Sequence, residues 1–191
     1  MRNDAVRADR VLEFLRLVVP GIIDVQSKAL GPKETLEFTE STTPDERSRR
    51  FLASSMSDGT LRALGVIVAL FQHPGGGRTI PVVGIEEPEM ALHPAAAGVL
   101  FDCLREASLS RQVLVTSHSP DLLDRSDIPV ESILAVSAED GKTFVGTVDK
   151  ASKKILGDRM RTAGELLRLN QITPDWAAIP NSSDLQLRLF K

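Results

Sequence analysis

The sequence has a single cysteine, no long apolar run and no large excess of charge of either sign. Because Cys103 has no second thiol to pair with, an intrachain disulfide is excluded, and a reducing cytosol is the expected environment. Cys103 lies in an apolar helical pattern, which favours a buried and unreactive thiol. The apolar run Leu61–Phe71 is too short to cross a membrane and is interrupted by Arg62. The charged N-terminus is not followed by the apolar stretch of a secretory signal, so we expect a cytoplasmic protein with no membrane partner.

The formal net charge of −3 offers no general attraction to nucleic acid or to an anionic membrane. A local basic patch, for example around Arg47, Arg49 and Arg50, is still compatible with DNA binding. The 191 residues are 42% apolar and 26% charged, close to the globular average, and they suffice for one domain with a core. We find no internal repeat, heptad series or low-complexity tract, and no domain boundary within the chain.

Apolar periodicity predicts strands and helices that alternate through the middle of the chain. A polar stretch, Glu40–Arg50, and a Pro/Gly-rich stretch, His73–Arg78, are expected to be surface loops. The Glu139–Lys142 stretch is expected to form a hairpin turn. Helices are expected over about 5–19, 61–71, 94–107, 121–123 and 164–169, and strands over about 22–29, 35–38, 80–87, 112–116, 132–136 and 143–148. Such alternation is typical of an α/β fold, with a largely parallel core sheet flanked by helices.

The strand that begins near Ile80 ends in two adjacent carboxylates, Glu86 and Glu87, with a third at Glu89. Charges are rarely left inside a strand that is buried on both faces, so these carboxylates should lie at its carboxyl end. Ligands of open α/β sheets bind at that edge. Two carboxylates there suit a metal-bound phosphate and an attacking water, which points to nucleotide hydrolysis.

Glu86 and Glu87 are expected to have different tasks, because adjacent side chains on an extended strand point to opposite faces. One would help to hold Mg²⁺, and the other would orient and deprotonate water. The alternative is a solvated turn that Pro88 separates from the strand. The apolar strand, the third carboxylate and a second strand with a polar end favour the first interpretation.

His118 follows that second buried strand, Gln112–Thr116, and should therefore lie at the same edge of the sheet. A histidine there can donate a hydrogen bond to a terminal phosphate oxygen and respond to its loss. The alternative is an exposed His118 beside a serine that caps the next helix. No Gly-x-Ser-x-Gly elbow is present, which argues against a serine hydrolase.

The segment Ser57-Asp58-Gly59-Thr60 opens the helix expected over 61–71. It is compatible with an ordinary N-cap. A serine and a glycine at a helix N-terminus can also form an anion site, because free backbone N–H groups and the helix dipole attract phosphate.

Taken in order, these motifs resemble those of the ATP-binding-cassette class of P-loop ATPases, specifically the SMC/RecF/OLD-like group of prokaryotic AAA-family proteins. The resemblance extends from roughly Phe51 to Val136 and implies a P-loop NTPase-like fold. The matching segments are Ser57-Asp58-Gly59-Thr60, Ile85-Glu86-Glu87-Pro88-Glu89, Leu92-His93-Pro94 and Thr116-Ser117-His118-Ser119-Pro120.

The resemblance implies a role for each segment, with ATP and Mg²⁺ as cofactors. Ser57-Asp58-Gly59 belongs to the signature motif, which in this family contacts ATP held by the opposite protomer. In the Walker B motif, Glu86 takes the Mg²⁺-associated place, where Asp is commoner in the family, and Glu87 takes the catalytic place. His93 falls in the D-loop region, and His118 takes the place of the switch histidine.

A P-loop requires Gly-x-x-x-x-Gly-Lys-(Ser/Thr), which the sequence does not contain. The nearest stretch, Gln72–Thr79, lacks the first glycine and the lysine and precedes a strand, so a surface turn is expected. The chain thus resembles the C-terminal half of an ATPase domain, and we interpret 1–191 as a single partial domain. Its parts are a lead-in helix and strands over about 1–50, the motif-bearing region over about 51–150, and a helical tail over about 151–191. A truncated product, a fragment and one half of a split enzyme all fit this pattern.

Three functions stay open from the sequence. The first is an ATPase half that works with a second ATPase protomer or the missing N-terminal half, and that acts on a nucleic acid or a partner protein in repair, chromosome maintenance or phage defence. The second is a non-catalytic regulatory or interaction module. The third is a Mg²⁺-dependent nuclease with a centre made by Glu86, Glu87, Glu89, His93 and His118, although these residues lie mostly on one element.

Overall fold

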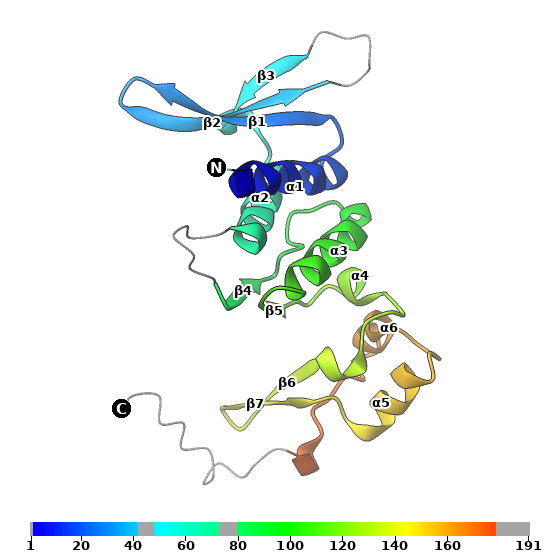
Figure 1. Ribbon diagram of the computed structural model, residues 1–191. Helices are drawn as coiled ribbons and strands as arrows, with labels where there is room; N and C mark the ends of the chain where they lie inside the picture. Colours follow the sequence, from blue (N-terminus) through cyan, green and yellow to red (C-terminus); the bar gives the residue numbers. More distant parts are fainter. Residues whose placement is uncertain (1, 42–47, 73–79, 179–191) are drawn as a thin grey trace, which may run out of the picture. The chain divides into compact units, whose positions relative to one another are not determined.

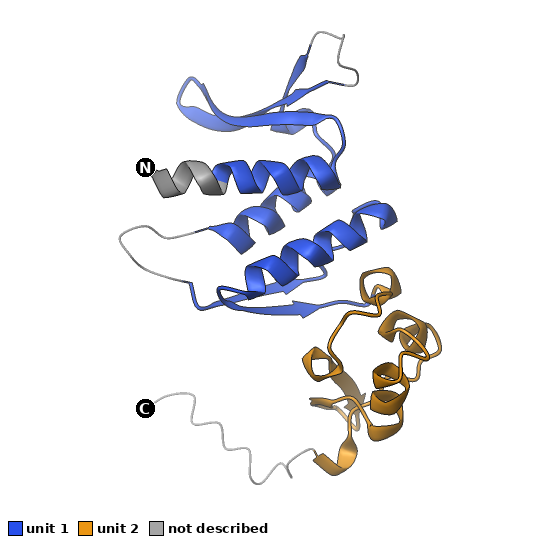
Figure 2. Ribbon diagram, turned by 45° about the vertical axis from the view of Figure 1, so that its right-hand side comes forward, with its two compact units in different colours: residues 1–118 blue, residues 119–191 orange. Residues whose placement is uncertain are grey.

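The computed structural model describes residues 2–41, 48–72 and 80–178, in two compact units (Figures 1 and 2). The first unit is Met1–His118 and the second is Ser119–Lys191. Most of the loop expected over Glu40–Arg50, the Gly-rich turn over 73–79 and the end of the tail lie outside the described residues. The single partial domain over 1–191 stays a prediction.

The first unit contains an antiparallel sheet, a parallel strand pair and three long helices (Figure 1). Its elements are α1 (Arg2–Val18), β1 (Ile22–Leu30), β2 (Lys33–Glu40), β3 (Arg49–Leu52), α2 (Asp58–Phe71), β4 (Val82–Glu86), α3 (Ala97–Ser108) and β5 (Gln112–Thr116). Short 3₁₀ turns precede α2 and α3, over Ala53–Ser55 and Pro94–Ala96. The expected helices and strands of this region are confirmed, apart from β3, which falls at the end of the stretch expected to be a loop.

The antiparallel sheet has the order β1-β2-β3. The β1–β2 hairpin turns at Gly31, whose φ of 62° is easily adopted only without a side chain. Ile22 and Phe38 are buried on this sheet, and α1 packs against β1. The strand β3 pairs its four residues with β2, from Glu37↔Leu52 to Glu40↔Arg49. Its polar first half explains why apolar periodicity did not indicate it.

The helices α1, α2 and α3 of the first unit pack against one another around an apolar core. Leu15, Leu70 and Leu100, one from each helix, are almost completely buried. The rings of Phe14 and Phe71 stack with their centroids 5.5 Å apart. Among the described residues, no helix is both long and apolar enough to span a bilayer.

The parallel pair β4–β5 confirms the expected α/β fold with a parallel sheet flanked by helices. Its register runs from Val82↔Gln112 to Glu86↔Thr116. Helix α3 connects the two strands and packs on β5, while α2 packs on β4. Parallel pairing is confined to these two strands among the described strands, and the other two sheets are antiparallel.

The second unit contains a two-stranded hairpin and three helices of four to eight residues. Its elements are α4 (Pro120–Leu123), β6 (Leu134–Glu139), β7 (Lys142–Thr147), α5 (Lys150–Gly157) and α6 (Ala163–Arg168), with short 3₁₀ turns at Val130–Ser132 and Trp176–Ala178. The expected hairpin turn is confirmed: Asp140 and Gly141 both have positive φ between the paired Glu139 and Lys142. The helix α5 was not predicted, although the Asp149 side chain accepts hydrogen bonds from the Ala151 and Ser152 amides as its N-cap.

Cys103 is fully buried in α3, as the sequence predicts. Burial, followed by the nearby negative charge of Glu106, raises the pKa of the Cys103 thiol to about 12. At pH 8 about one thiol in ten thousand is then ionised, and only the thiolate reacts. We expect iodoacetamide to leave the native chain unlabelled at pH 8 over a time that labels it fully in urea, as mass spectrometry would show. Equal labelling rates in the two conditions would contradict the buried position.

Candidate functional site

The carboxyl ends of β4 and β5 bring Glu87 and His118 together. Because Glu86 pairs with Thr116, the residues that follow each strand emerge side by side, and the Glu87 amide donates to the Thr116 carbonyl at 2.9 Å. His118 Nε2 lies 3.7 Å from Glu87 Oε1. The His118 amide donates to Glu87 Oε2 at 3.4 Å. The prediction that these two side chains meet at one edge of the sheet is confirmed, while their catalytic roles stay a prediction.

Glu87 and His118 differ in their access to solvent. The Glu87 side chain is 20% exposed, and the His118 side chain is 94% exposed. Water screens a partly buried carboxylate less than a fully exposed one. The buried carboxylate therefore interacts more strongly with a charge or a proton donor. The exposed imidazole can rotate toward a ligand without disturbing the core. This pair therefore combines a largely buried carboxylate with an exposed imidazole.

Glu86 and Glu87 differ in environment for a reason other than the expected strand alternation. Glu86 is the last residue of β4 and is exposed. Glu87 lies beyond the strand with a φ of 45°, a left-handed conformation that is costly for a residue with a Cβ. The alternation of side chains between the two faces of a strand therefore does not apply to Glu87, which lies outside β4. A backbone turn directs its carboxylate toward the loop after β5.

The N-terminus of α2 is capped by its own motif. Ser57 Oγ accepts a hydrogen bond from the Thr60 amide at 3.1 Å, so the N-cap interpretation of this serine is confirmed. Asp58 is exposed in the first turn, where its negative charge suits the helix dipole. A Cβ on Gly59 would lie 2.3 Å from the Ala91 carbonyl oxygen, so Gly59 allows the main chain after β4 to approach the helix. Nucleotide contacts by these residues stay a prediction.

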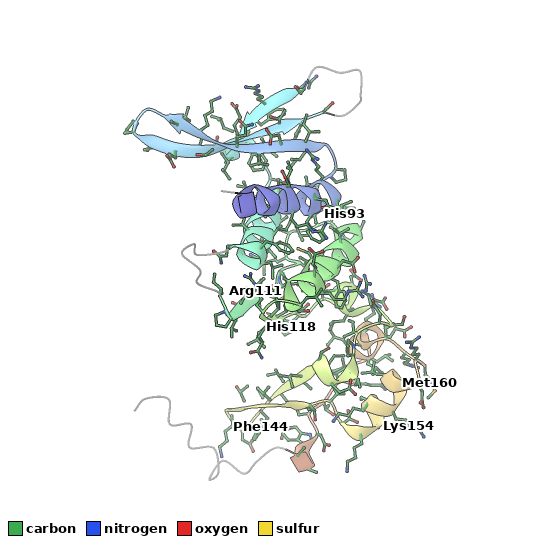
Figure 3. The ribbon with its side chains drawn as sticks, in the orientation of Figure 1. His93, Arg111, His118, Phe144, Lys154 and Met160 are labelled. Carbon is green, nitrogen blue, oxygen red and sulfur yellow. The ribbon has the colours of Figure 1, made fainter. Side chains whose placement is uncertain are left out.

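His93 is not brought to the Glu87–His118 pair. Its Nδ1 accepts a hydrogen bond from the Ala95 amide at 3.2 Å and caps the short turn Pro94–Ala96. Figure 3 shows His93 and His118 at separate places in the first unit. No group of three or more His, Cys, Asp or Glu side chains in the described ranges is arranged to hold a metal ion. The cluster that the nuclease alternative requires is therefore not formed there.

Arg62 of α2 contacts the loop after β4, and its motif-free position in the sequence does not mark it as a functional residue. Arg62 Nη2 donates to the Glu86 carbonyl at 3.0 Å and to the Glu87 carbonyl at 2.9 Å. Arg62 is three positions after Gly59, so both lie on the same side of α2. The positive charge that interrupts the apolar run Leu61–Phe71 was the signal that could have identified it.

Glu89 forms a second connection between the loops that follow β4 and β5. Its Oε1 accepts a hydrogen bond from the Ser117 hydroxyl. Its other oxygen, Oε2, is buried and has no hydrogen-bond partner among the described residues. The sequence predicts a metal-ligand role for Glu89 only in the nuclease alternative, although Glu89 also supports the phosphate-site interpretation as a third carboxylate. In the structure, the Glu89 hydrogen bond connects the turn after Glu87 to Ser117, the residue before His118.

A protein-family model described as "AAA domain, putative AbiEii toxin, Type IV TA system" matches residues 3–124, more than half of the chain. The matched region includes every residue of the site described above. No curated protein sequence matches the chain.

Solved structures of SMC ATPase heads share the fold. One, from work on the ATP-driven dimerization and DNA-stimulated activation of SMC ATPases, has 18% identity and a TM-score of 0.55, with 84% of this chain and 95% of that chain covered. The Smc head domain with a coiled coil and joint from Pyrococcus yayanosii has 20% identity and a TM-score of 0.54, covering 84% of this chain and 30% of that one. The Smc head with an extended coiled coil bound to the C-terminal domain of ScpA, from Pyrococcus furiosus, has 18% identity and a TM-score of 0.53, covering 84% of this chain and 39% of that one.

The chain thus spans well under half of these two Pyrococcus proteins. It belongs to the family of AAA domains whose model matches residues 3–124, and its fold is that of the ATPase heads of SMC proteins.

Proposed function

We propose that this chain supplies the water-activating half of an ATPase site, and that a P-loop from outside the 191 residues holds the ATP phosphates. The observation that carries the proposal is the meeting of Glu87 and His118, 3.7 Å apart at the carboxyl edge of β4–β5. Ligands of α/β sheets bind at this edge. Membership of the AAA-domain family supports ATP as the ligand.

Glu87 is the general base of the proposed reaction. Its carboxylate accepts the proton of the attacking water as the oxygen approaches the terminal phosphorus of ATP. The exposed His118 imidazole donates to an oxygen of the transferred phosphoryl group, where negative charge must be stabilised. The main chain of Glu87 is held by the Thr116 carbonyl on one side and by Arg62 on the other, so its carboxylate needs little reorientation during the reaction.

Glu86 fits a Mg²⁺-associated role. It is an exposed carboxylate at a strand end, and Mg²⁺ in nucleotide sites takes one or two carboxylates, substrate phosphates and several waters. When bound, the ion would neutralise charge on the phosphate oxygens. Ser57 and Gly59, at the N-terminus of α2, would contact ATP that a second protomer holds, through backbone N–H groups and the helix dipole.

We infer from the exposed side chains of β5 that the P-loop segment would bind beside this strand. Parallel sheets are normally covered on both faces, yet Leu114 is 49% exposed and its neighbour Val115, which faces the other side, is 36% exposed. The strand carries no charge and no proline, the devices that usually protect an edge. A further parallel strand along β5 would bring its following loop to the edge that holds Glu87 and His118.

Complementation tests the proposal. We expect the isolated chain to hydrolyse no ATP, and a P-loop-bearing ATPase segment encoded beside it in the host to restore hydrolysis on mixing. Leu114→Asp should reduce the restored rate at least about tenfold, because the added segment would cover this face of the sheet and bury the charge. Val136→Asp is the matched control: Val136 is 64% exposed on β6, and the rate should stay within about twofold of wild type. Hydrolysis by the isolated chain would contradict the proposal, and binding without hydrolysis would favour the non-catalytic module.

The coupled process is proposed to be a change in a bound nucleic acid or partner protein. The DNA-stimulated activation and the ScpA binding of the SMC proteins named above support this part of the proposal. In the restored assembly, hydrolysis would open the contact between protomers and release or move that partner.

A further inference from the structure

Arg62 contacts the backbone at Glu87 from α2, an element outside the two strands that carry the proposed catalytic residues. One nitrogen, Nη2, donates to two consecutive carbonyls, those of Glu86 and Glu87. Arg62 Nε is buried and meets no hydrogen-bond acceptor among the described residues. A buried N–H without an acceptor costs free energy. The remaining hydrogen bonds of the guanidinium must therefore hold the side chain in this position. Those contacts are with the backbone of the proposed general base.

The backbone at Glu87 is fixed on each side by a different element. Its amide donates to Thr116 at the end of β5, at 2.9 Å. Its carbonyl accepts from Arg62 and also from the Met90 amide, at 3.0 Å. The left-handed conformation of Glu87 persists only where surrounding contacts determine it. Arg62 provides the contact from α2, the helix that Ser57 caps at its N-terminus.

We propose that Arg62 is a positioning residue that fixes the left-handed turn at Glu87 and so directs the Glu87 carboxylate toward the attacking water. Arg62 does not touch the reacting atoms. Because it belongs to α2, it makes the orientation of Glu87 depend on the position of the helix that carries Ser57 and Gly59. Contact between Gly59 and the Ala91 carbonyl connects the same helix to the far end of the turn. The catalytic part of this inference rests on the proposed function, whereas the structural part does not.

The first test uses the free chain and amide hydrogen exchange measured by NMR. Arg62→Met removes the donors and keeps most of the side-chain length. We expect exchange at the Glu87 and Met90 amides to rise at least about tenfold, with no change in the interior of α3. Arg62→Lys retains a positive donor and should give a smaller increase.

Arg111→Met is the matched control. Arg111 Nη1 donates to the Gln72 carbonyl at 3.2 Å, and Arg111 Nε is likewise buried without a partner in the described part of the chain. Figure 3 labels Arg111 in the same unit. This variant loses a similar contact away from Glu87, so the Glu87 and Met90 amides should exchange as in wild type. Unchanged exchange at both amides in Arg62→Met, or a uniform rise across the first unit, would overturn the proposal.

The second test uses the restored ATPase assembly. Loss of the Arg62 contact should lower kcat about 10- to 100-fold and leave KM for ATP within about twofold, because misplacing the base affects the chemical step and not nucleotide binding. Arg62→Lys should recover part of kcat, and Arg111→Met should match wild type. A rise in KM at unchanged kcat would refute the positioning role. If the wild-type assembly hydrolyses no ATP, the proposed function fails, and the exchange result alone then decides whether Arg62 fixes the turn.

Discussion

Replacing Glu87 with glutamine in a complete ATPase assembly is expected to reduce ATP hydrolysis by about 10²- to 10⁴-fold, the contribution of a positioned general base. Glutamine has nearly the same shape but cannot accept a proton from water at neutral pH. The Glu87 backbone contacts to Thr116 and Arg62 use main-chain atoms, so they persist in the variant. ATP binding and the ATP-bound dimer should therefore survive, and the dimer should accumulate because hydrolysis no longer opens it.

The measurement is a phosphate-release assay combined with size-exclusion chromatography in the presence of Mg-ATP. Glu34→Gln is the matched control, because Glu34 is an exposed residue of β2 and the substitution removes the same charge. Its hydrolysis rate should equal that of wild type. If Glu87→Gln retained more than about a tenth of the wild-type rate, Glu87 would not be the base. Loss of ATP binding in Glu87→Gln would instead indicate a role in holding the nucleotide or its metal ion.

The meeting of Glu87 and His118 could be predicted from sequence because it depends only on where two apolar strands end. The strands β4 and β5 are short, apolar runs, and parallel neighbours align their carboxyl ends. The residues that follow them must then emerge at one edge. The order of the motifs along the chain was sufficient for this prediction.

The conformation of Glu87 could not be predicted in the same way. A left-handed residue is specified by contacts from outside its own strand, here from Thr116 on β5 and Arg62 on α2. Periodicity within β4 contains no information on either contact. For the same reason Arg62 was noted only as a charge in an apolar run, and its partners became clear only from the packing of α2 against β4.

Two secondary-structure elements were missed for local reasons. The strand β3 begins with Arg49 and Arg50, and polar residues on an edge strand do not produce an apolar pattern. The helix α5 carries lysines at three of its eight positions. Its start at Asp149 is a capping signal that apolar periodicity does not detect.

Gly59 has two interpretations that predict different results for the free chain. In the first, its backbone N–H contacts a phosphate and a side chain would obstruct the ligand. In the second, a side chain would collide with the chain's own backbone, because a Cβ would lie 2.3 Å from the Ala91 oxygen and 3.3 Å from the Ala91 carbon. A backbone carbonyl cannot rotate away as a flexible side chain can. The structure favours a packing requirement that exists without any nucleotide.

Gly59→Ala is therefore expected to lower the free energy of unfolding of the free chain by about 1–3 kcal/mol, the usual cost of overpacking. Gly65→Ala is the matched control on the same helix. Gly65 is exposed, and its added Cβ would meet no atom within 4 Å. Alanine is the better helix former, so Gly65→Ala should raise the free energy of unfolding by about 0.5–1 kcal/mol.

Urea denaturation of both variants without nucleotide decides between the interpretations. The two substitutions add the same methyl group to the same helix, so opposite signs would point to the close approach of Ala91 to Gly59. Cys103 lies in the same unit, and its labelling rate gives an independent measure of opening there. If Gly59→Ala stabilised the free chain as Gly65→Ala does, the Ala91 main chain could shift with little loss of free energy. The requirement for glycine would then come from the nucleotide alone. If it destabilises the chain as expected, loss of ATPase activity in this variant cannot by itself be taken as loss of a phosphate contact, because the turn from Glu87 to Ala91 will have moved with it.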